Sequence, residues 1–169
     1  GEATLPWDSV EARSQTSETL LNVLCSSPPG VIEALLAELG VLAGASTPFV
    51  SDTLTEDELA GLARVPRVTV GAHGVGHLWL PALATPDRFA EIWGSRERLQ
   101  RVVRQNIDAF AYPYGGYDSA TRALVEASGF RIAVTTEARR CARGDSPLLL
   151  PRFDAALMTP QDVASLAGR

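Results

Sequence analysis

The chain has 169 residues, of which 46% are hydrophobic and 21% are charged, and its formal net charge is −5. These values are typical of one globular domain with a sizeable core. The acidic balance gives no electrostatic reason to expect binding to nucleic acid or to an anionic membrane. All 15 basic residues are arginine, which we interpret as the bias of a GC-rich genome. No stretch reaches the roughly 18 consecutive apolar residues that a membrane span requires.

The two cysteines and the single methionine give little information about the fold. Cys25 and Cys141 are too few to indicate a disulfide framework, and Cys25, in an apolar helical stretch, is predicted to be a small core residue. The only methionine is Met158, and the first residue is Gly1. We therefore expect further sequence in front of residue 1.

The first third of the chain is predicted to be helical. Apolar spacing compatible with helices covers residues 10–25 and 29–39, and a loop rich in Gly, Ser and Thr is expected over 41–54. Thr55 and Glu58 have the spacing of a capping box, in which each residue satisfies a free amide of the other. This motif predicts a short helix that ends at about residue 64.

A strand and a long helix follow. The β-branched run over 67–71 predicts a strand. Thr85-Pro86-Asp87 predicts the start of a helix, with Thr85 as its N-cap. The buried stripe of this helix is expected to comprise Phe89, Ile92, Trp93, Leu99 and Val103.

The remaining sequence again alternates strands and helices. Strands are expected over 108–112 and 131–135, with a third apolar run at 148–150. Asp118 is expected to cap the helix between the first two strands, and Thr159-Pro160 to begin a terminal helix. This alternation predicts an α/β fold in which neighbouring strands are parallel and the helices lie outside. The strands are too few for a closed barrel.

The two histidines are the most informative feature. His73 and His77 are four residues apart and directly follow the predicted strand over 67–71. Two imidazoles at this spacing can reach one divalent cation. Glycines in this segment disfavour a helix, so we expect the pair on a loop at the carboxyl end of a strand, where α/β folds keep their active sites. The alternative is a pair of polar loop residues without a ligand.

The order of these motifs resembles the polysaccharide deacetylase family, in particular its nodulation-type chitooligosaccharide deacetylase homology domain. The matching segments are Gly71-Ala72-His73-Gly74-Val75-Gly76-His77, then Phe110-Ala111-Tyr112-Pro113-Tyr114-Gly115, and Leu150-Pro151-Arg152. The resemblance covers about residues 55–155. Residues 1–54 are similar to a helical insert of some members, and residues 156–169 form the terminal helix. We therefore expect a single, partial domain.

The resemblance implies a distorted, incomplete parallel β/α barrel, truncated here at its N-terminus. It also implies removal of N- or O-acetyl groups from a carbohydrate substrate with a divalent metal, zinc above all. His73 and His77 match the metal ligands, whereas Gly74 replaces the family's Ser or Thr, so we expect a less firmly braced loop. Tyr114 matches the tyrosine whose backbone amide holds the developing oxyanion. The expected substrate-binding residues are Trp79, Tyr112, Pro113 and Tyr114.

Two parts of the family's machinery are absent from this sequence. One is an Asp-Asp pair that supplies a metal ligand and the catalytic base, and the other is a late histidine that acts as general acid. A catalytic zinc usually has three protein ligands, so we expect the third ligand and the base upstream of Gly1, and weak activity from the 169 residues alone. Arg152 is either catalytic or pairs with a carboxylate to hold the end of the chain.

A second interpretation belongs to another class of protein. The same scaffold could serve as a non-catalytic carbohydrate-binding or interaction domain. In that case Trp79, Tyr112, Tyr114 and Tyr117 would provide surfaces on which sugar rings stack, beside an idle histidine pair.

Overall fold

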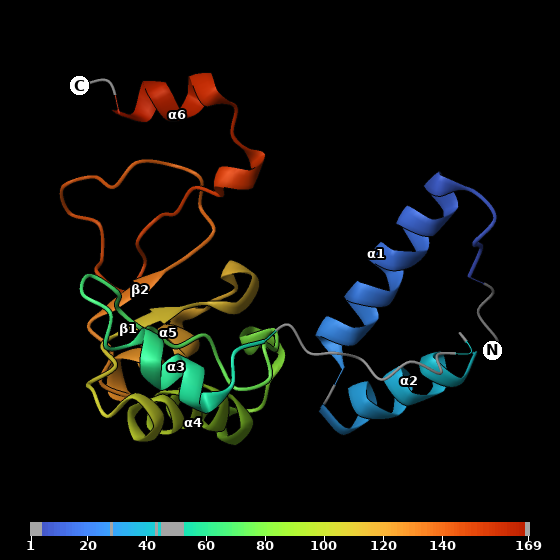
Figure 1. Cartoon of the computed structure of the whole chain (residues 1–169), viewed down its shortest axis with the longest axis horizontal. Helices are drawn as coiled ribbons and strands as arrows, with labels where there is room; N and C mark the ends of the chain where they lie inside the picture. Colours follow the sequence, from blue (N-terminus) through green and yellow to red (C-terminus); the bar gives the residue numbers. More distant parts are fainter. Residues whose placement is uncertain (1–4, 28, 43, 45–52, 168–169) are drawn as a thin grey trace. The chain divides into compact units, whose positions relative to one another are not determined.

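The computed structural model describes residues 5–27, 29–42, 44 and 53–167 and divides the chain into two compact units, Gly1–Thr53 and Leu54–Arg169 (Figure 1). The first unit contains helices α1 (Val10–Ser26) and α2 (Pro29–Leu42), so the helices predicted there are confirmed. The predictions for the Cys25 side chain and for most of the loop over 41–54 lie outside the described residues. None of the described helices is both long and apolar enough to cross a membrane.

The second unit contains the motifs singled out in the sequence. Its regular elements, in chain order, are α3 (Glu56–Leu62), α4 (Thr85–Val103), β1 (Ala109–Ala111), α5 (Ser119–Ala127), β2 (Ile132–Val134) and α6 (Pro160–Ala167). Three short 3₁₀ turns accompany them, at Leu80–Ala82, Pro113–Gly115 and Ala155–Leu157.

Local capping signals placed two helix starts correctly and misplaced a third. The capping box is present, with the Thr55 hydroxyl accepting from the Glu58 amide and the Glu58 carboxylate accepting from the Thr55 amide. Asp118 caps α5 by accepting from the Thr121 amide at 2.6 Å. The prediction that Thr85 caps α4 is wrong. The helix begins one residue earlier than expected, so Thr85 lies in its first turn and Ala84 is the N-cap, without a side-chain bond.

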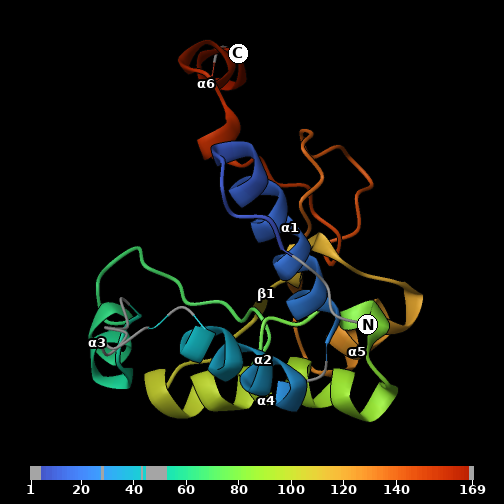
Figure 2. The same ribbon diagram turned by 90° about the vertical axis from the view of Figure 1, so that its right-hand side faces the viewer.

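Four parallel segments form the sheet, in the order in which they occur in the chain. β1 and β2 pair in parallel, with Phe110 opposite Ala133, which confirms the prediction for these two strands. Isolated parallel bridges add Ala72 beside Phe110 and Leu150 beside Val134. α4 lies along one side of this unit, and α6 lies on the opposite side in both views (Figures 1 and 2).

The strand predicted over 67–71 is not a regular strand. A turn closed by the Val68 amide and the Val65 carbonyl occupies its first residues, and Arg67 has a φ of 70°. The chain reaches the sheet only at Ala72, whose amide donates to Ala109 and whose carbonyl accepts from Ala111. The direction is parallel, as expected, but the pairing is confined to one residue. This short contact brings His73 directly to the carboxyl end of the sheet.

The core lies between the sheet and its helices. Its largest fully buried side chains include Phe110, Tyr112, Ile92 and Ile107. The stripe predicted for α4 is correct for Ile92 and Val103 and partly for Leu99, but wrong for two aromatic residues. Phe89 and Trp93 are 40% and 41% exposed and stack on each other, with ring centroids 5.9 Å apart. Polar residues of the neighbouring face are buried in their place, namely Arg88, Glu91 and Ser95.

Buried Arg88 ties several segments together. Its guanidinium donates to the Asp118 carboxylate at 3.0 Å and to the Thr121 hydroxyl at 3.1 Å. The same group donates to the backbone carbonyls of Pro81 and Leu83 at 3.0 and 2.9 Å. Burial of this charge is tolerated because it is paired and hydrogen-bonded. Arg88 thereby connects α4 to the start of α5 and to the 3₁₀ turn that follows the histidines.

Candidate active site

Two sequence motifs meet at the carboxyl end of the sheet. The histidine loop, residues 73–77, follows Ala72, and the turn at 112–116 follows β1, the neighbour of Ala72 in the sheet. Carboxyl ends of adjacent parallel strands lie at one edge, so the segments that leave them approach each other. The His77 and Tyr114 rings make an edge-to-face contact, with centroids 4.5 Å apart.

The two imidazoles lie side by side. Their ring centroids are 4.6 Å apart, with the planes inclined by 74°. The Nδ1 atom of His73 lies 2.7 Å from the Ala111 carbonyl oxygen. A carbonyl oxygen can only accept, so Nδ1 carries a proton. This bond leaves Nε2 of His73 as the ring nitrogen through which a metal could bind.

His77 is also kept in a form that can bind a metal. Partial loss of hydration around this otherwise exposed residue, and secondarily the neighbouring His73, lower the pKa of the His77 imidazole below its ordinary value. A lowered pKa favours the uncharged ring, which is the form that binds a metal. Among the described residues, however, no group of three or more His, Cys, Asp and Glu side chains could hold a metal ion. The pair fits a divalent cation in its donor atoms but lacks a third partner within the described part of the chain.

The loop is braced in spite of Gly74. One carboxylate oxygen of Glu91 accepts from the Val75 and Gly76 amides at 3.0 and 2.8 Å. Glu91 is only 9% exposed and lies on α4. A long-range contact thus holds this loop, where the sequence led us to expect a weaker brace. Sequence reasoning missed Glu91, and the only available signal was an acidic residue beside Ile92 in an amphipathic helix.

Two of the predicted substrate-binding residues belong to the core. Tyr112 is fully buried, and its hydroxyl donates to the Leu148 carbonyl at 3.0 Å. Pro113 is also fully buried. Neither side chain has exposed surface to offer a carbohydrate, so the substrate-binding role predicted for Tyr112 and Pro113 stays a prediction that finds no support in their burial. The alternation of a strand places Phe110 and Tyr112 on the same face, and that face packs inside the molecule.

Tyr114 has the opposite environment. It is 44% exposed, and its backbone has a φ of 55° within the 3₁₀ turn. Its carbonyl lies 3.5 Å from the Thr136 hydroxyl, which donates to it. The turn therefore presents the Tyr114 ring beside His77, while the expected role of its backbone amide stays a prediction.

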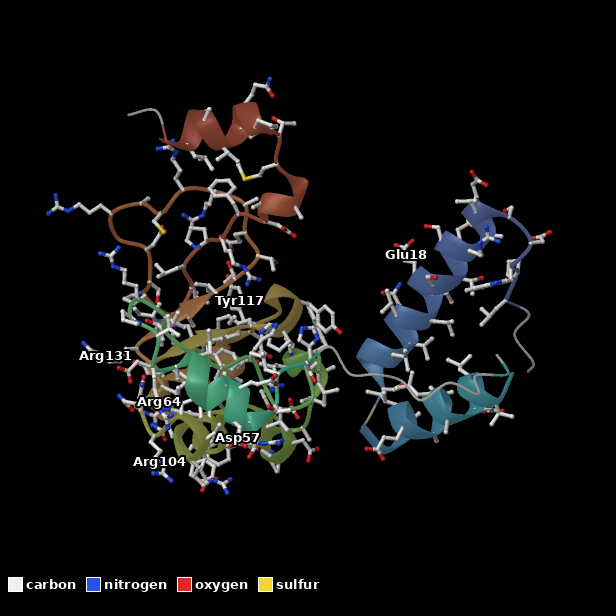
Figure 3. The ribbon with its side chains drawn as sticks, viewed as in Figure 1. Glu18, Asp57, Arg64, Arg104, Tyr117 and Arg131 are labelled. Carbon is white, nitrogen blue, oxygen red and sulfur yellow. The ribbon has the colours of Figure 1, made fainter. Side chains whose placement is uncertain are left out.

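Trp79 and Tyr117 are two further aromatic residues with partly exposed rings. Trp79 is 39% exposed, its ring centroid is 6.5 Å from that of Tyr114, and its six-membered ring covers Gly116. A Cβ atom on Gly116 would lie 2.4 Å from this ring, so the close approach requires glycine. Tyr117 is 36% exposed and donates from its hydroxyl to Glu137 at 3.3 Å (Figure 3). Of these partly exposed rings, Tyr114 contacts His77 directly, and Trp79 lies next to Tyr114.

Arg152 lies farther along the chain, in the segment after Leu150. Its side chain is exposed, and its backbone amide donates to the Glu137 carbonyl at 3.0 Å. It lines a pocket of about 560 Å³ together with Thr136, Phe153 and Met158. Both roles considered for Arg152, catalysis and pairing with a carboxylate, stay predictions.

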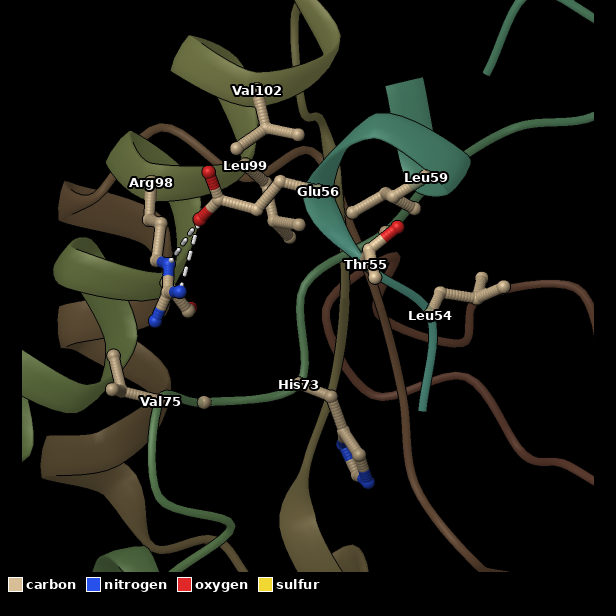
Figure 4. A pocket seen from close by; sticks show the side chains of 12 residues that line it. Leu54, Thr55, Glu56, Leu59, His73, Val75, Arg98, Leu99 and Val102 are labelled. Atoms are coloured by element: carbon tan, nitrogen blue, oxygen red, sulfur yellow. Dashed lines mark hydrogen bonds and ion pairs between the residues drawn. The ribbon is translucent and has the colours of Figure 1, made fainter. Parts of the chain in front are cut away.

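A second pocket adjoins the histidine loop. It has a volume of about 350 Å³ and lies between α3, α4 and the start of the loop (Figure 4). Leu59, Leu99 and Val102 give it an apolar lining, and the Arg98–Glu56 ion pair, at 3.0 Å, lies beside it. The ring of His73 points away from α3 (Figure 4).

The sequence of this chain matches a known protein family. The sequence pattern of the family described as "Polysaccharide deacetylase" matches residues 28–133, well over half of the chain. This match begins in front of the 55–155 segment in which the resemblance was seen. The YxkH protein of Bacillus subtilis (strain 168), named provisionally as a polysaccharide deacetylase, is 26% identical over 99 residues, which cover 59% of this chain and 35% of that protein.

Solved structures of two deacetylases have a fold similar to that of this chain. The Streptococcus pyogenes deacetylase PplD, solved in complex with acetate, aligns with a TM-score of 0.62 and 23% identity over 75% of this chain and 54% of its own. A polysaccharide deacetylase from Bacillus cereus aligns with a TM-score of 0.61 and 22% identity over 69% of this chain and 37% of its own. The chain thus spans about a third to a half of the length of these proteins. From the extent of the family match, this chain belongs to the polysaccharide deacetylase family.

Proposed function

We propose that the chain forms part of the active site of a metal-dependent carbohydrate deacetylase, which hydrolyses N- or O-acetyl groups. The observation that carries this proposal is the pair of adjacent imidazoles, 4.6 Å apart, with Nδ1 of His73 held by the Ala111 carbonyl. We further propose that the parallel sheet is part of an incomplete β/α barrel, for which the similarity to solved deacetylases is the support.

Each residue at the site would have a separate role in the reaction. His73 and His77 would hold a divalent cation, for which we propose zinc, through ring nitrogens of neutral imidazoles. When bound, such a cation polarises an acetyl carbonyl and lowers the pKa of an attacking water. The Tyr114 backbone amide would donate to the oxygen on which negative charge develops. Trp79 and the Tyr114 ring, both partly exposed, would orient the sugar.

Two imidazoles are one ligand short of the usual catalytic zinc site. The proposal therefore requires a third ligand and a base from outside the described residues, two roles that the acidic pair typical of the family would fill. We propose that the 169-residue chain by itself binds zinc weakly and deacetylates poorly. General base catalysis alone contributes roughly 10²–10⁴-fold to a rate.

Zinc calorimetry and an acetate-release assay on acetylated chitooligosaccharides test this proposal. We expect an N-terminally extended version to exceed the 169-residue chain in both measurements. The variants His73→Ala and His77→Ala should each abolish zinc binding and acetate release without loss of the folded structure. Full activity of the 169-residue chain would show that it contains the third ligand, and zinc binding that survives both variants would refute the assigned site.

A non-catalytic carbohydrate-binding domain is the second candidate function. The exposed rings of Trp79, Tyr114 and Tyr117 favour it, because aromatic faces stack on sugars. This function predicts oligosaccharide binding that persists with a chelator present and in the His73→Ala variant, without release of acetate from the extended version. Calorimetric titration with the oligosaccharide, with and without a chelator, therefore separates the two functions.

A further inference from the structure

Glu91 is a buried acidic residue that contacts the middle of the histidine loop. It lies on α4 and is 9% exposed. Its Oε2 atom accepts from the Val75 amide at 3.0 Å and from the Gly76 amide at 2.8 Å. Hydrogen bonds from backbone amides to an ionised carboxylate are among the stronger ones in proteins. A single carboxylate from a helix therefore fixes two consecutive peptide units of the loop.

The sequence of the loop is fitted to this carboxylate. A Cβ atom on Gly74 would lie 3.1 Å from Oε2 of Glu91, and one on Gly76 would lie 3.2 Å from Oε1. Gly74 also has a φ of 78°, a conformation that favours glycine. The two glycines therefore let the backbone approach Glu91 closely enough for both amides to bond. The Gly-x-Gly spacing between the histidines has its physical explanation here.

Glu91 holds the loop at its centre, and other groups hold its ends. The His73 ring is fixed by the Ala111 carbonyl, and the His77 ring by edge-to-face contacts with His73 and Tyr114. Among the described residues, the two histidines and Glu91 do not form a cluster that could hold a metal. The Glu91 carboxylate is engaged by the loop amides, so its contribution passes through the backbone.

We propose that Glu91 is a positioning residue, which clamps the histidine loop through the Val75 and Gly76 amides and so sets the separation of the two imidazoles. This inference rests on the proposed metal-binding function of His73 and His77. Partners of this kind, which orient ligands without touching the metal, typically change metal affinity by about 10–100-fold when they are removed.

Zinc calorimetry on the 169-residue chain gives the first test. We expect Glu91→Ala to weaken zinc binding by about 10–100-fold. Glu91→Gln should weaken it less, because its side-chain carbonyl oxygen can still accept from both amides. Glu97→Gln, on the same helix, is the matched control and should bind zinc as the unmodified chain does. Equal affinities for the unmodified chain, Glu91→Ala and Glu91→Gln would overturn the proposal.

A double-mutant cycle gives a sharper test. Gly76→Ala places a methyl group against the carboxylate, so it should weaken zinc binding when Glu91 is present. In the Glu91→Ala background the same change meets no carboxylate, and its effect should be smaller. Residues in contact give such non-additive effects, whereas independent sites add. Strictly additive losses would contradict the clamp.

The metal-free protein separates this inference from the proposed function. If neither the unmodified chain nor its N-terminally extended version bound zinc, the metal-binding function would fail, but the imidazole resonances of His73 and His77 could still be compared by nuclear magnetic resonance. We expect these resonances to shift, and the Val75 and Gly76 amides to exchange faster, in Glu91→Ala, with an intermediate effect in Glu91→Gln. Unchanged ring resonances and amide exchange in both variants, at an unchanged melting temperature, would overturn the clamp.

Discussion

The histidine loop at 73–77 and the turn at 112–116 meet at the same end of the sheet, but they are held by different means. The loop keeps its two imidazoles exposed and is fixed through its backbone, by Glu91 and by the Ala111 carbonyl. The turn instead buries its first side chain, Tyr112, completely in the core.

Because of this difference, the loop contacts and the turn contacts should affect different properties, namely metal affinity and stability. Contacts of the loop serve its exposed rings, so their loss should reduce metal affinity while the fold persists. Contacts of the turn are part of the core, so their loss should reduce the free energy of unfolding. Tyr114 combines the two environments, because its backbone belongs to the turn and its exposed ring lies against His77.

The largest effect on stability is expected at Tyr112. Tyr112→Ala removes a fully buried ring and should lower the free energy of unfolding by about 3–5 kcal/mol, as other large-to-alanine core substitutions do. Tyr112→Phe loses only the hydrogen bond to Leu148 and should cost about 1–2 kcal/mol. Urea unfolding measures both. If the turn serves stability and not metal binding, the zinc affinity of Tyr112→Phe stays unchanged. A loss of unfolding free energy below about 1 kcal/mol in Tyr112→Ala would refute the assignment of Tyr112 to the core.

Gly115 tests the backbone of the turn. It has a φ of 73°, and a Cβ atom there would lie 2.1 Å from the Thr136 hydroxyl oxygen. Gly115→Ala should therefore destabilise the chain by about 2–3 kcal/mol, from conformational strain and collision together. Gly144 is the matched control, because it has a φ of 103° and open space around it. Gly144→Ala should cost about 1–2 kcal/mol, and equal losses in thermal unfolding would show that Thr136 yields easily.

The smallest effect on the free energy of unfolding is expected at Asp118, and it depends on pH. Hydrogen bonds from the Thr121 hydroxyl and amide, and then the Arg88 charge, lower the pKa of the Asp118 carboxyl below its ordinary value. A lowered folded-state pKa gives stability that is present above the unfolded pKa of about 3.9 and is lost as the pH falls through the folded value. Asp118→Asn keeps a helix cap but leaves the buried Arg88 charge without its anionic partner, so it should cost about 1–2 kcal/mol at pH 7.

The same variant should flatten the dependence of unfolding free energy on pH below about pH 4. Urea unfolding at several pH values measures this slope. An unchanged slope would mean that Asp118 is not a source of acid sensitivity at this end of the sheet. Zinc affinity at neutral pH should stay unchanged, because Asp118 belongs to the start of α5 and not to the histidine loop.

Much of the local structure could be predicted from the sequence. The capping box at Thr55, the cap at Asp118 and the parallel pairing of β1 with β2 follow from spacing and composition, which act over a few residues. The position of the histidines after a sheet segment was also predictable, because an apolar β-branched run precedes them. The caps depend on residues that are close together in the chain, and the parallel pairing follows from the strand–helix–strand order between residues 109 and 134.

Other features were decided by contacts between distant residues. Whether Tyr112 is buried depends on Leu148, 36 residues away, and no local pattern distinguishes it from exposed Tyr114. Phe89 and Trp93 fit an apolar stripe, but the neighbouring face of α4 turns inward because Arg88 and Glu91 find partners there. Hydrophobic spacing shows that a helix has a buried side. Which polar residues join that side is settled only when tertiary packing provides hydrogen bonds that offset their loss of hydration.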